Sequence, residues 1–301
     1  MSEVGGVPVV WCPFYKVDIG QHVFQVEKYR LVKERLGAEG LLSNLTLHSP
    51  RSASSQDVLR VHTPSYWQKV LKGRFTPQEE GILEIPFSDA VREASLFCAA
   101  GTTLAGRLAL NHGRAVHLGG GFHHAFADHG EGFCLLNDVA IAAASLLTEK
   151  TVERITIVDL DVHHGNGTAA IFADEPRIFT FSMHQQRNYP SIKPPGDLDV
   201  GLENGVGDDE YLAILTEHLP RILEDHQPQL IIYLAGADPY EIDQLGGLGL
   251  SLCGLRQRDD FVMKSAADCG SGVAVTLAGG YAINPSDTVE IHCGTVRAAL
   301  A

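Results

Sequence analysis

The sequence has no long apolar run, no excess of positive charge and no closely spaced pair of cysteines, and each absence excludes a class of protein. No stretch approaches the roughly 18 to 20 apolar residues of a membrane-spanning helix. Asp and Glu outnumber Lys and Arg by 37 to 23, so the formal net charge is −14. The clustered positive charge that neutralises nucleic-acid phosphates is therefore lacking over the chain as a whole. We expect neither a membrane span nor a nucleic-acid partner.

The cysteines and the N-terminus indicate the compartment. The six cysteines, at positions 12, 98, 134, 253, 269 and 293, form no Cys-x-x-Cys pair, which argues against a zinc ribbon or a thioredoxin-like motif. We expect them to be reduced, buried thiols. The start of the chain, Met1–Val4, lacks the basic region and apolar core of a secretory signal, so we expect a cytoplasmic protein. The net negative charge is common in such proteins, but it would also attract a cationic substrate.

The composition is that of a globular protein: 301 residues, of which 45% are hydrophobic and 20% charged. This suits one large α/β domain over residues 1–301, with two smaller domains as the alternative. Short apolar runs predict strands at 7–10, 115–118, 155–160, 178–182, 230–235 and 273–278. Amphipathic patterns predict helices at 90–111, 138–148, 210–224, 256–268 and 286–300. The alternation implies a central, mostly parallel sheet with helices on both faces, and ligands bind such sheets outside the carboxyl ends of the strands.

Ionisable side chains follow the apolar strand at 155–160. In an extended backbone Asp159, Asp161 and His163 would share one face of the strand. Unpaired buried charges are costly unless a metal or a hydrogen bond compensates them. This row therefore predicts half of a metal site.

Two further clusters follow predicted strands. His123 and His124 come after three glycines, in a segment that lacks the residues of a P-loop or a dinucleotide fingerprint; they are either functional imidazoles or helix caps. Asp238, after the strand at 230–235, is either a helix cap or a third metal ligand. With Asp161 and His163 it would complete a catalytic zinc set with open coordination positions. Tyr281 follows two glycines and is either a core tyrosine or a hydroxyl donor.

Five motifs occur together in a recognisable order, and they resemble those of the zinc-dependent histone deacetylase family, which has the arginase/deacetylase fold. The motifs are His117-Leu-Gly-Gly-Gly-Phe-His-His124, Gly132-Phe-Cys-Leu-Leu-Asn-Asp138, Asp159-Leu-Asp-Val-His-His-Gly-Asn-Gly167, Gly236-Ala-Asp238 and Gly279-Gly-Tyr281. The segments 182–185, 189–190 and 197–199 look most like bacterial relatives of the class IV deacetylases.

The resemblance implies a role for each matching residue. Asp161, His163 and Asp238 would bind one catalytic Zn²⁺, which lowers the pKa of bound water from about 16 towards 7. His124 would accept the proton of that water and pass it to the leaving amine, while His123 would act as its electrostatic partner. Tyr281 would donate to the developing oxyanion.

The resemblance also implies supporting residues. Asp159 would face His123, and Asn166 would face His124 where class I members have an aspartate. His124 should therefore be the easier of the two histidines to deprotonate. Phe133 and Tyr189 would form a narrow tunnel for the acyl-lysine stem, and the Gly132 carbonyl would accept from the substrate amide. A structural K⁺ would be held by Ser182 and Asp161, with backbone carbonyls around Asp159, His163 and Met183.

Three other functions remain open to test. Arginase-type hydrolysis in this fold needs a second metal, but Gly165 and Tyr240 stand where its aspartate ligands would be. A deacetylase of acetylpolyamines or other small acylamines is the alternative substrate class, which an acidic protein would also attract. The third is a binding module without catalysis, although such a module would not need the complete set of catalytic residues.

Overall fold

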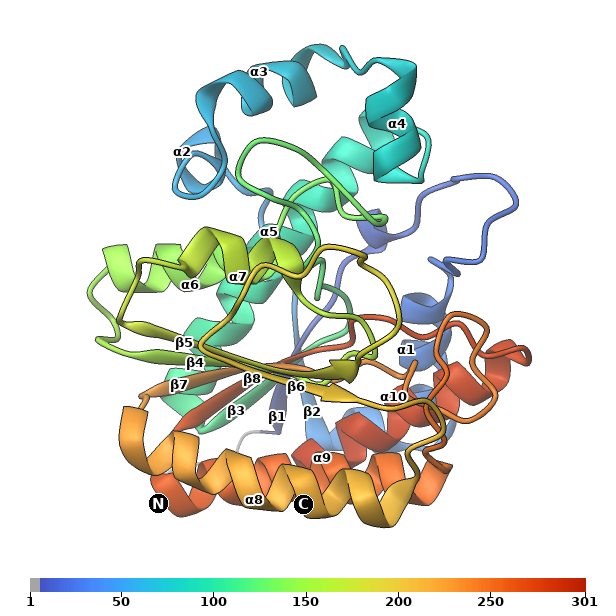
Figure 1. Ribbon diagram of the computed structural model, residues 1–301, viewed down its shortest axis with the longest axis vertical. Coiled ribbons are helices and arrows are strands. Elements are labelled where there is room, and N and C mark those ends of the chain that lie inside the picture. The colour runs from blue at the N-terminus through green and yellow to red at the C-terminus, as the bar shows by residue number, and fades with distance from the viewer. Residues whose placement is uncertain (1–5) are drawn as a thin grey trace.

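The computed structural model describes residues 6–301 and is built on one eight-stranded sheet (Figure 1). All strand pairs are parallel, in the order β2-β1-β3-β8-β7-β4-β5-β6. The strands are β1 (Val7–Val10), β2 (Leu45–His48), β3 (Arg114–His117), β4 (Ile155–Asp159), β5 (Ile178–Gln185), β6 (Leu198–Leu202), β7 (Leu230–Leu234) and β8 (Gly272–Thr276). The predicted α/β class with a parallel sheet is confirmed.

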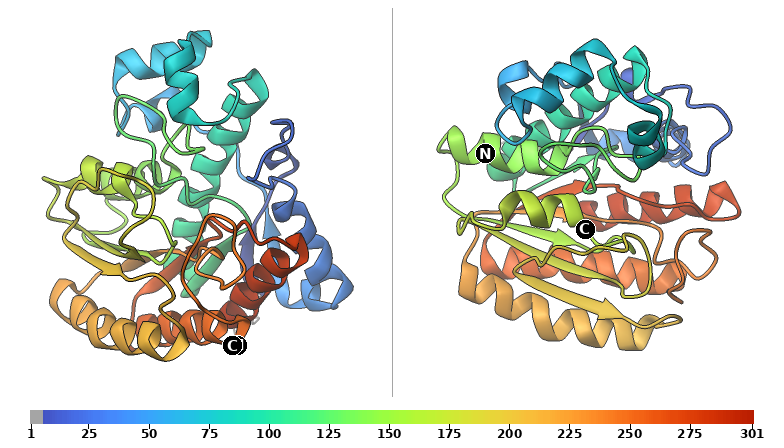
Figure 2. Two further views of the ribbon diagram at one scale, coloured as in Figure 1. Left: turned by 45° about the vertical axis from the view of Figure 1, so that its right-hand side comes forward. Right: turned by 45° about the horizontal axis from the view of Figure 1, so that its top comes forward.

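Helices cover both faces of the sheet. They are α1 (Lys28–Ala38), α2 (Ser55–Val58), α3 (Pro64–Lys72), α4 (Pro77–Leu83), α5 (Asp89–His112), α6 (Asp138–Thr148), α7 (Asn166–Phe172), α8 (Asp208–His226), α9 (Leu252–Cys269) and α10 (Pro285–Leu300). The helices α5, α6 and α7 lie on one face, and α8, α9 and α10 on the other (Figure 1). The short helices α2, α3 and α4 lie together at one end of the molecule (Figures 1 and 2).

The central strands match the sequence prediction better than the edge strands. All residues of β4, β7 and β8 are buried, because helices cover both of their faces, and such strands appear as continuous apolar runs. The two strands that the sequence analysis missed, β2 and β6, lie at the edges of the sheet and contain exposed polar residues. Their segments, Leu-Thr-Leu-His and Leu-Asp-Val-Gly-Leu, are four and five residues long, and such short alternations do not stand out from the surrounding sequence.

Several predicted boundaries were wrong. The strand predicted at 155–160 ends at Asp159, so Asp161 and His163 lie in the following turn, and alternation along a strand does not explain their positions. The strand predicted at 273–278 likewise ends early, at Thr276, and its last two apolar residues belong to the loop that follows. The expectation of buried cysteines fails for Cys253 and Cys269, which are exposed, while all six thiols are free.

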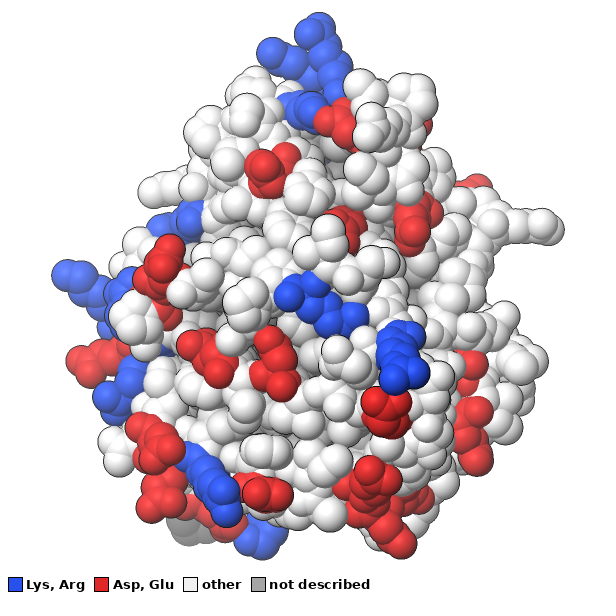
Figure 3. Space-filling view, in the orientation of Figure 1, with Lys and Arg blue, Asp and Glu red and all other residues white. Residues whose placement is uncertain are grey.

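Two observations concern the expected compartment. Within residues 6–301 no helix is both long and apolar enough to cross a bilayer. The N-terminal segment Met1–Val4, on which the expectation of a missing signal rests, lies outside the described residues. Asp and Glu side chains are dispersed over the face shown in Figure 3, with Lys and Arg among them.

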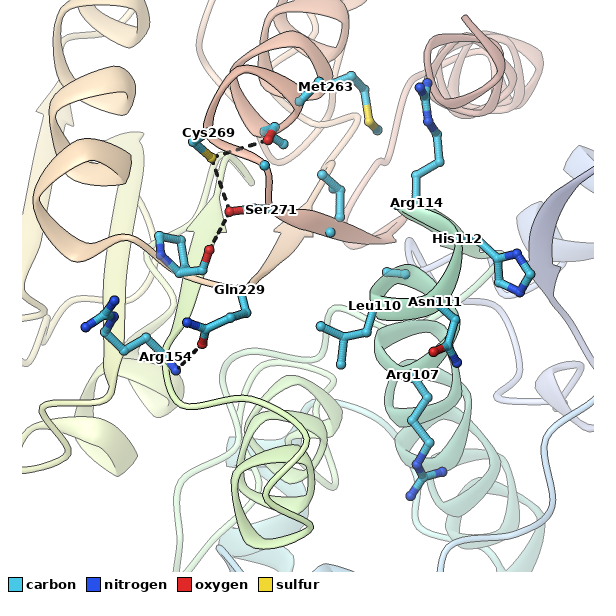
Figure 4. Close-up of a pocket in the computed structure, with 18 of the residues that line it drawn as sticks. Arg107, Leu110, Asn111, His112, Arg114, Arg154, Gln229, Met263, Cys269 and Ser271 are labelled. Atoms are coloured by element: carbon cyan, nitrogen blue, oxygen red, sulfur yellow. Dashed lines mark hydrogen bonds between the residues drawn. The ribbon is translucent and has the colours of Figure 1, made fainter. Parts of the chain in front are cut away.

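A cavity of about 1100 Å³ lies at the amino ends of the central strands (Figure 4). Three arginines line it, but their side chains point away from one another (Figure 4). Arg107 pairs with Glu149, while Arg114 and Arg154 donate to the carbonyls of Ala299 and Gln227. These guanidinium groups are therefore engaged in contacts within the chain, and the clustered ionisable groups of the motifs lie at the opposite, carboxyl edge.

Candidate active site

The paired histidines are carried by a glycine loop after β3. Gly120 and Gly121 have φ values of 71° and 88°, in the left-handed region that favours glycine. A Cβ atom on Gly120 would also lie 2.5 Å from an oxygen of Asp138. That buried carboxylate accepts the backbone N–H groups of Gly121 (3.1 Å) and Phe122 (2.7 Å). The aspartate at the start of α6 thereby holds the loop that carries His123 and His124.

The three predicted metal ligands come together in the structure. Asp161 and His163 follow β4, and Asp238 follows the neighbouring strand β7. His163 Nδ1 lies 3.0 Å from Asp161 Oδ1 and 3.4 Å from Asp238 Oδ2, and one potential ligand atom from each residue falls within a 4.8 Å span. All three side chains are buried. The three residues that the sequence predicted as one ligand set, from two segments of the chain, therefore form one compact group.

These three residues fit a metal ion. Asp238 Oδ2 is buried and has no hydrogen-bond partner among residues 6–301, although a buried carboxylate oxygen requires one. Burial opposes the imidazolium form of His163, yet the two carboxylates raise its pKa to about 10, so a positive charge is favoured at this point. Any side chain on Gly279 would collide with the carboxylates of Asp238 and Asp161. The space between the carboxylates is thus kept free and favours a cation.

The two histidines have different partners. His123 Nδ1 lies 2.6 Å from Asp159 Oδ2, and His124 Nδ1 donates to Asn166 Oδ1 at 2.7 Å. Burial disfavours charge on both rings. The Asp159 carboxylate nevertheless raises the pKa of His123 to about 9, whereas burial and the neighbouring His123 and His163 hold the pKa of His124 well below its usual value. The electrostatics thus agree with the expectation that His124 is the easier to deprotonate.

Glu131 completes this arrangement, and the sequence analysis missed it. Its Oε1 accepts from Asn166 Nδ2 and from the Tyr189 hydroxyl, both at 2.8 Å. Burial opposes its ionisation, but hydrogen bonds from His129, Tyr189 and Asn166 lower its pKa. Glu131 therefore fixes which end of the Asn166 amide faces His124. Nothing in the local sequence marks it, because its partners lie 35 and 58 residues away.

Tyr281 lies beside the predicted metal ligands. Its ring centroid is 6.3 Å from that of His163, and its backbone N–H donates to Asp243 Oδ2 at 2.6 Å. Burial raises its pKa well above the usual value, so the hydroxyl keeps its proton and remains a donor. Behind it the buried Lys28 donates to the carbonyl of Ala278 at 2.6 Å. Burial lowers the pKa of Lys28 to about 8.

The predicted tunnel residues line a cavity that ends at the histidines and Tyr281. The cavity has a volume of about 220 Å³. Its lining consists of Glu84, His124, Gly132, Phe133, His163, Asn188, Tyr189, Leu245 and Tyr281. The backbone N–H groups of Gly132 and Phe133 donate to the carbonyls of Ile82 and Leu83 at 3.1 and 2.8 Å. Helix α4 thus positions this wall of the cavity, and Glu84, Asn188 and Leu245 are lining residues that the motifs did not reveal.

Of the residues predicted for K⁺, Asp159 lies on β4 and Ser182 and Met183 lie on the neighbouring β5, while Asp161 and His163 follow β4. Asp159 of β4 is in register with Ser182 of β5, and Met183 follows. The Ser182 hydroxyl forms a 3.0 Å hydrogen bond with His184 Nδ1. The K⁺ site stays a prediction. His184 also belongs to a second group of potential metal ligands, with His164 and Asp199, in which His164 Nε2 and Asp199 Oδ1 are already hydrogen-bonded at 3.1 Å.

An all-parallel eight-stranded sheet with this polar group at its carboxyl edge is a form of the arginase/deacetylase fold. The sequence matches the histone deacetylase domain over residues 22–295, so the chain belongs to the histone deacetylase family. It is 41% identical to an uncharacterized protein of Picosynechococcus sp., covering 98% of both chains. It is 31% identical to histone deacetylase 2 of Arabidopsis thaliana, covering 86% of this chain and 70% of that one.

The comparison of structures agrees on the fold. The crystal structure of the HDA15 HD domain superposes with a TM-score of 0.82 and covers 98% of this chain and 90% of that one. At 21% identity this likeness concerns the fold alone. The "probable deacetylase" of Archaeoglobus fulgidus is 30% identical over 87% of this chain and 77% of that protein. Together the family match and these relatives support a deacetylase-type hydrolase.

Proposed function

We propose that this protein is a zinc-dependent lysine deacylase, which hydrolyses Nε-acyl-lysine in proteins or peptides. The observation that carries the proposal is the buried group Asp161, His163 and Asp238. It contains a carboxylate oxygen that has no hydrogen-bond partner in the described part of the chain, and it lies beside two histidines with different pKa values. Catalytic zinc sites have three protein ligands of these types and leave a position for water. Single-domain organisation, a structural K⁺ and a cytoplasmic location remain part of the prediction.

Each residue of the site has a defined task in this reaction. When bound, Zn²⁺ would lower the pKa of a water molecule to about 7 and polarise the amide carbonyl. His124 donates from Nδ1 to Asn166, so its Nε2, which lies 3.2 Å from His123 Nε2, is the atom that would accept a proton. The low pKa of His124 keeps this nitrogen unprotonated before the reaction. His124 would then give this proton to the leaving amine. His123 stays charged beside Asp159 and stabilises negative charge, and the protonated hydroxyl of Tyr281 donates to the oxyanion.

The cavity supports an acylated amine on an unbranched stem. Phe133 and Tyr189 provide aromatic walls, and the cavity ends at His124 and Tyr281, where the acyl group would react. The alternative substrates, acetylpolyamines or other small acylamines, would also fit an acidic protein, and Glu84 lies at the lining of this cavity. A binding module without catalysis is disfavoured because the full set of acid, base and oxyanion groups is in place.

The test uses one acetyl-lysine peptide and acetylputrescine, each at equal concentration, with and without a chelator. We expect turnover of the peptide that the chelator abolishes and added zinc restores. His124→Ala should reduce turnover by at least about a hundredfold, as expected for loss of general base catalysis. His112→Ala, at the opposite edge of the sheet, is the matched control and should match the wild type. Turnover that survives both chelation and His124→Ala would refute the mechanism, and turnover of acetylputrescine alone would refute the substrate class.

A further inference from the structure

A buried ion pair lies behind the predicted metal ligands, in helix α9. The side chains of Arg258 and Asp259 are 0% and 1% exposed. Arg258 Nε donates to Asp259 Oδ1 at 2.9 Å, and its NH2 nitrogen lies 2.8 Å from the same oxygen. Although burial disfavours charge, Asp259 keeps the pKa of Arg258 above its usual value. Arg258 therefore keeps its positive charge inside the protein.

Such a pair needs an explanation beyond stability. Transfer of two charges from water to the interior is so costly that replacing a buried ion pair by apolar side chains is often neutral or stabilising. A buried arginine has five N–H donors, and a single carboxylate does not use all of them. The remaining donors indicate why the pair is present.

Arg258 NH1 donates to two backbone carbonyls of different strand ends. The acceptors are Gly236 O at 2.7 Å and Leu160 O at 3.3 Å. Leu160 immediately precedes the metal ligand Asp161, and Gly236 stands two residues before Asp238. Both carbonyls lie just beyond Asp159 in β4 and Leu234 in β7, the last residues of the two strands that pair with each other. The guanidinium group thus links the two segments that follow β4 and β7, beyond the point where these strands stop pairing with each other.

The pair is itself anchored to other elements. The Tyr233 hydroxyl, from β7, donates to Asp259 Oδ1 at 2.5 Å, and the Thr295 hydroxyl, from α10, donates to Asp259 Oδ2 at 2.6 Å. Arg258 is therefore held by a carboxylate that two further elements fix. In the planar guanidinium, Nε and NH2 face Asp259 and thereby fix the direction of the NH1 group that bonds both carbonyls, whereas the single nitrogen of a lysine has no second group to anchor it.

We propose that Arg258 is a positioning residue for the metal site, which fixes the turns that carry Asp161 and Asp238 relative to each other. This inference rests on the proposed zinc site. Partners that orient metal ligands typically contribute about 10- to 100-fold to metal affinity. Without Arg258 the two carbonyls would be buried without this donor, and the turns would depend on the bond from the Val162 N–H to Asp238 Oδ1 (2.9 Å), an atom of a metal ligand. The zinc dissociation constant should then rise, even in a protein that remains folded.

The test compares Arg258→Met and Arg258→Lys with wild type. The zinc dissociation constant is measured by competition with a chromogenic chelator, and folding by circular dichroism and Tm. We expect the affinity to fall about 10- to 100-fold in Arg258→Met, and less in Arg258→Lys. Arg256→Met, which removes a surface pair on the same helix, is the control and should leave zinc binding unchanged.

Thr295→Val separates positioning from general destabilisation. It removes one hydrogen bond to Asp259 but leaves the bonds from Arg258 to the carbonyls of Leu160 and Gly236 in place. We therefore expect a lower Tm and a zinc affinity within about twofold of wild type. Normal zinc affinity in a folded Arg258→Met would overturn the proposal. If that variant fails to fold, normal affinity in Arg258→Lys does so, as does an equal loss of affinity in Thr295→Val. A wild-type protein that binds zinc without hydrolysing acyl-lysine would refute the proposed function and leave this inference standing.

Discussion

Replacing Asn166 with aspartate tests whether His124 is the base and His123 its charged partner. At present His124 Nδ1 donates to the neutral amide oxygen of Asn166 at 2.7 Å, and its pKa is held low. A carboxylate at the same place would stabilise the imidazolium form. The equivalent pair in the same site, His123 with Asp159, has a 2.6 Å contact and a pKa of about 9 instead of 6.5. We therefore expect the pKa of His124 to rise in the direction of the value of about 9 that His123 has beside Asp159.

Glu131 would reduce the effect of the single substitution on the pKa of His124, and a double variant removes this complication. The new carboxylate of Asn166→Asp would face Glu131 Oε1, to which Asn166 Nδ2 now donates at 2.8 Å. Two adjacent carboxylates share a proton, which would remove much of the new charge. Combining Asn166→Asp with Glu131→Gln supplies an amide donor in place of the repelling oxygen. The double variant should therefore show the larger shift of His124.

The assay is the pH dependence of kcat/KM for an acetyl-lysine peptide at saturating zinc. If His124 must be deprotonated to act as base, a higher pKa moves the acidic limb of the profile upward, so that activity at pH 6 to 7 falls more than activity at pH 9. The order of the midpoints should be wild type, then Asn166→Asp, then the double variant. Glu131→Gln alone is the control for the loss of the glutamate charge. An acidic limb that stays in place in the double variant would refute the assignment of His124 as the base.

Three further predictions concern neighbouring groups. Tyr281→Phe should lower kcat by about 10² to 10³ with little change in KM, because the hydroxyl acts on the transition state; a change in KM alone would contradict this role. Gly279→Ala should reduce the zinc content and Tm because its Cβ collides with both carboxylates, whereas Gly294→Ala, at an open helical position in α10, should leave the zinc content unchanged. Asp159→Asn should lower the pKa of His123 from about 9, since the carboxylate that opposes the effect of burial is lost, and an unchanged ring titration by NMR would exclude that origin.

The sequence predicted the central sheet and the members of the site better than their geometry. The buried strands β4, β7 and β8 are continuous apolar runs, and polar residues at their ends meet because parallel strands end at one edge. The prediction that Asp161 and His163 share a strand face was wrong, because the strand ends at Asp159. Residues whose partners lie in loops far away along the chain cannot be recognised from a pattern in the local sequence.

Glu131 and Arg258 illustrate that limit. Glu131 acts through Asn166 and Tyr189, and Arg258 through carbonyls 98 and 22 residues away. Neither follows from the hydrophobic pattern or from the motifs. The short helices α2, α3 and α4 were also missed, since four to nine residues are too few for a helical period to stand out.

The attachment of the cavity wall to α4 places the cavity wall and the reacting groups on different parts of the fold. The metal ligands and both histidines follow strands of the central sheet. In contrast, the backbone N–H groups of Gly132 and Phe133 donate to the carbonyls of Ile82 and Leu83, at the end of a short peripheral helix. Insertions or substitutions around that helix would reshape the entrance while the reacting groups stay in register. Related chains can therefore keep one chemistry and exchange their substrates, and libraries that vary residues 73–88 are the rational place to redirect specificity.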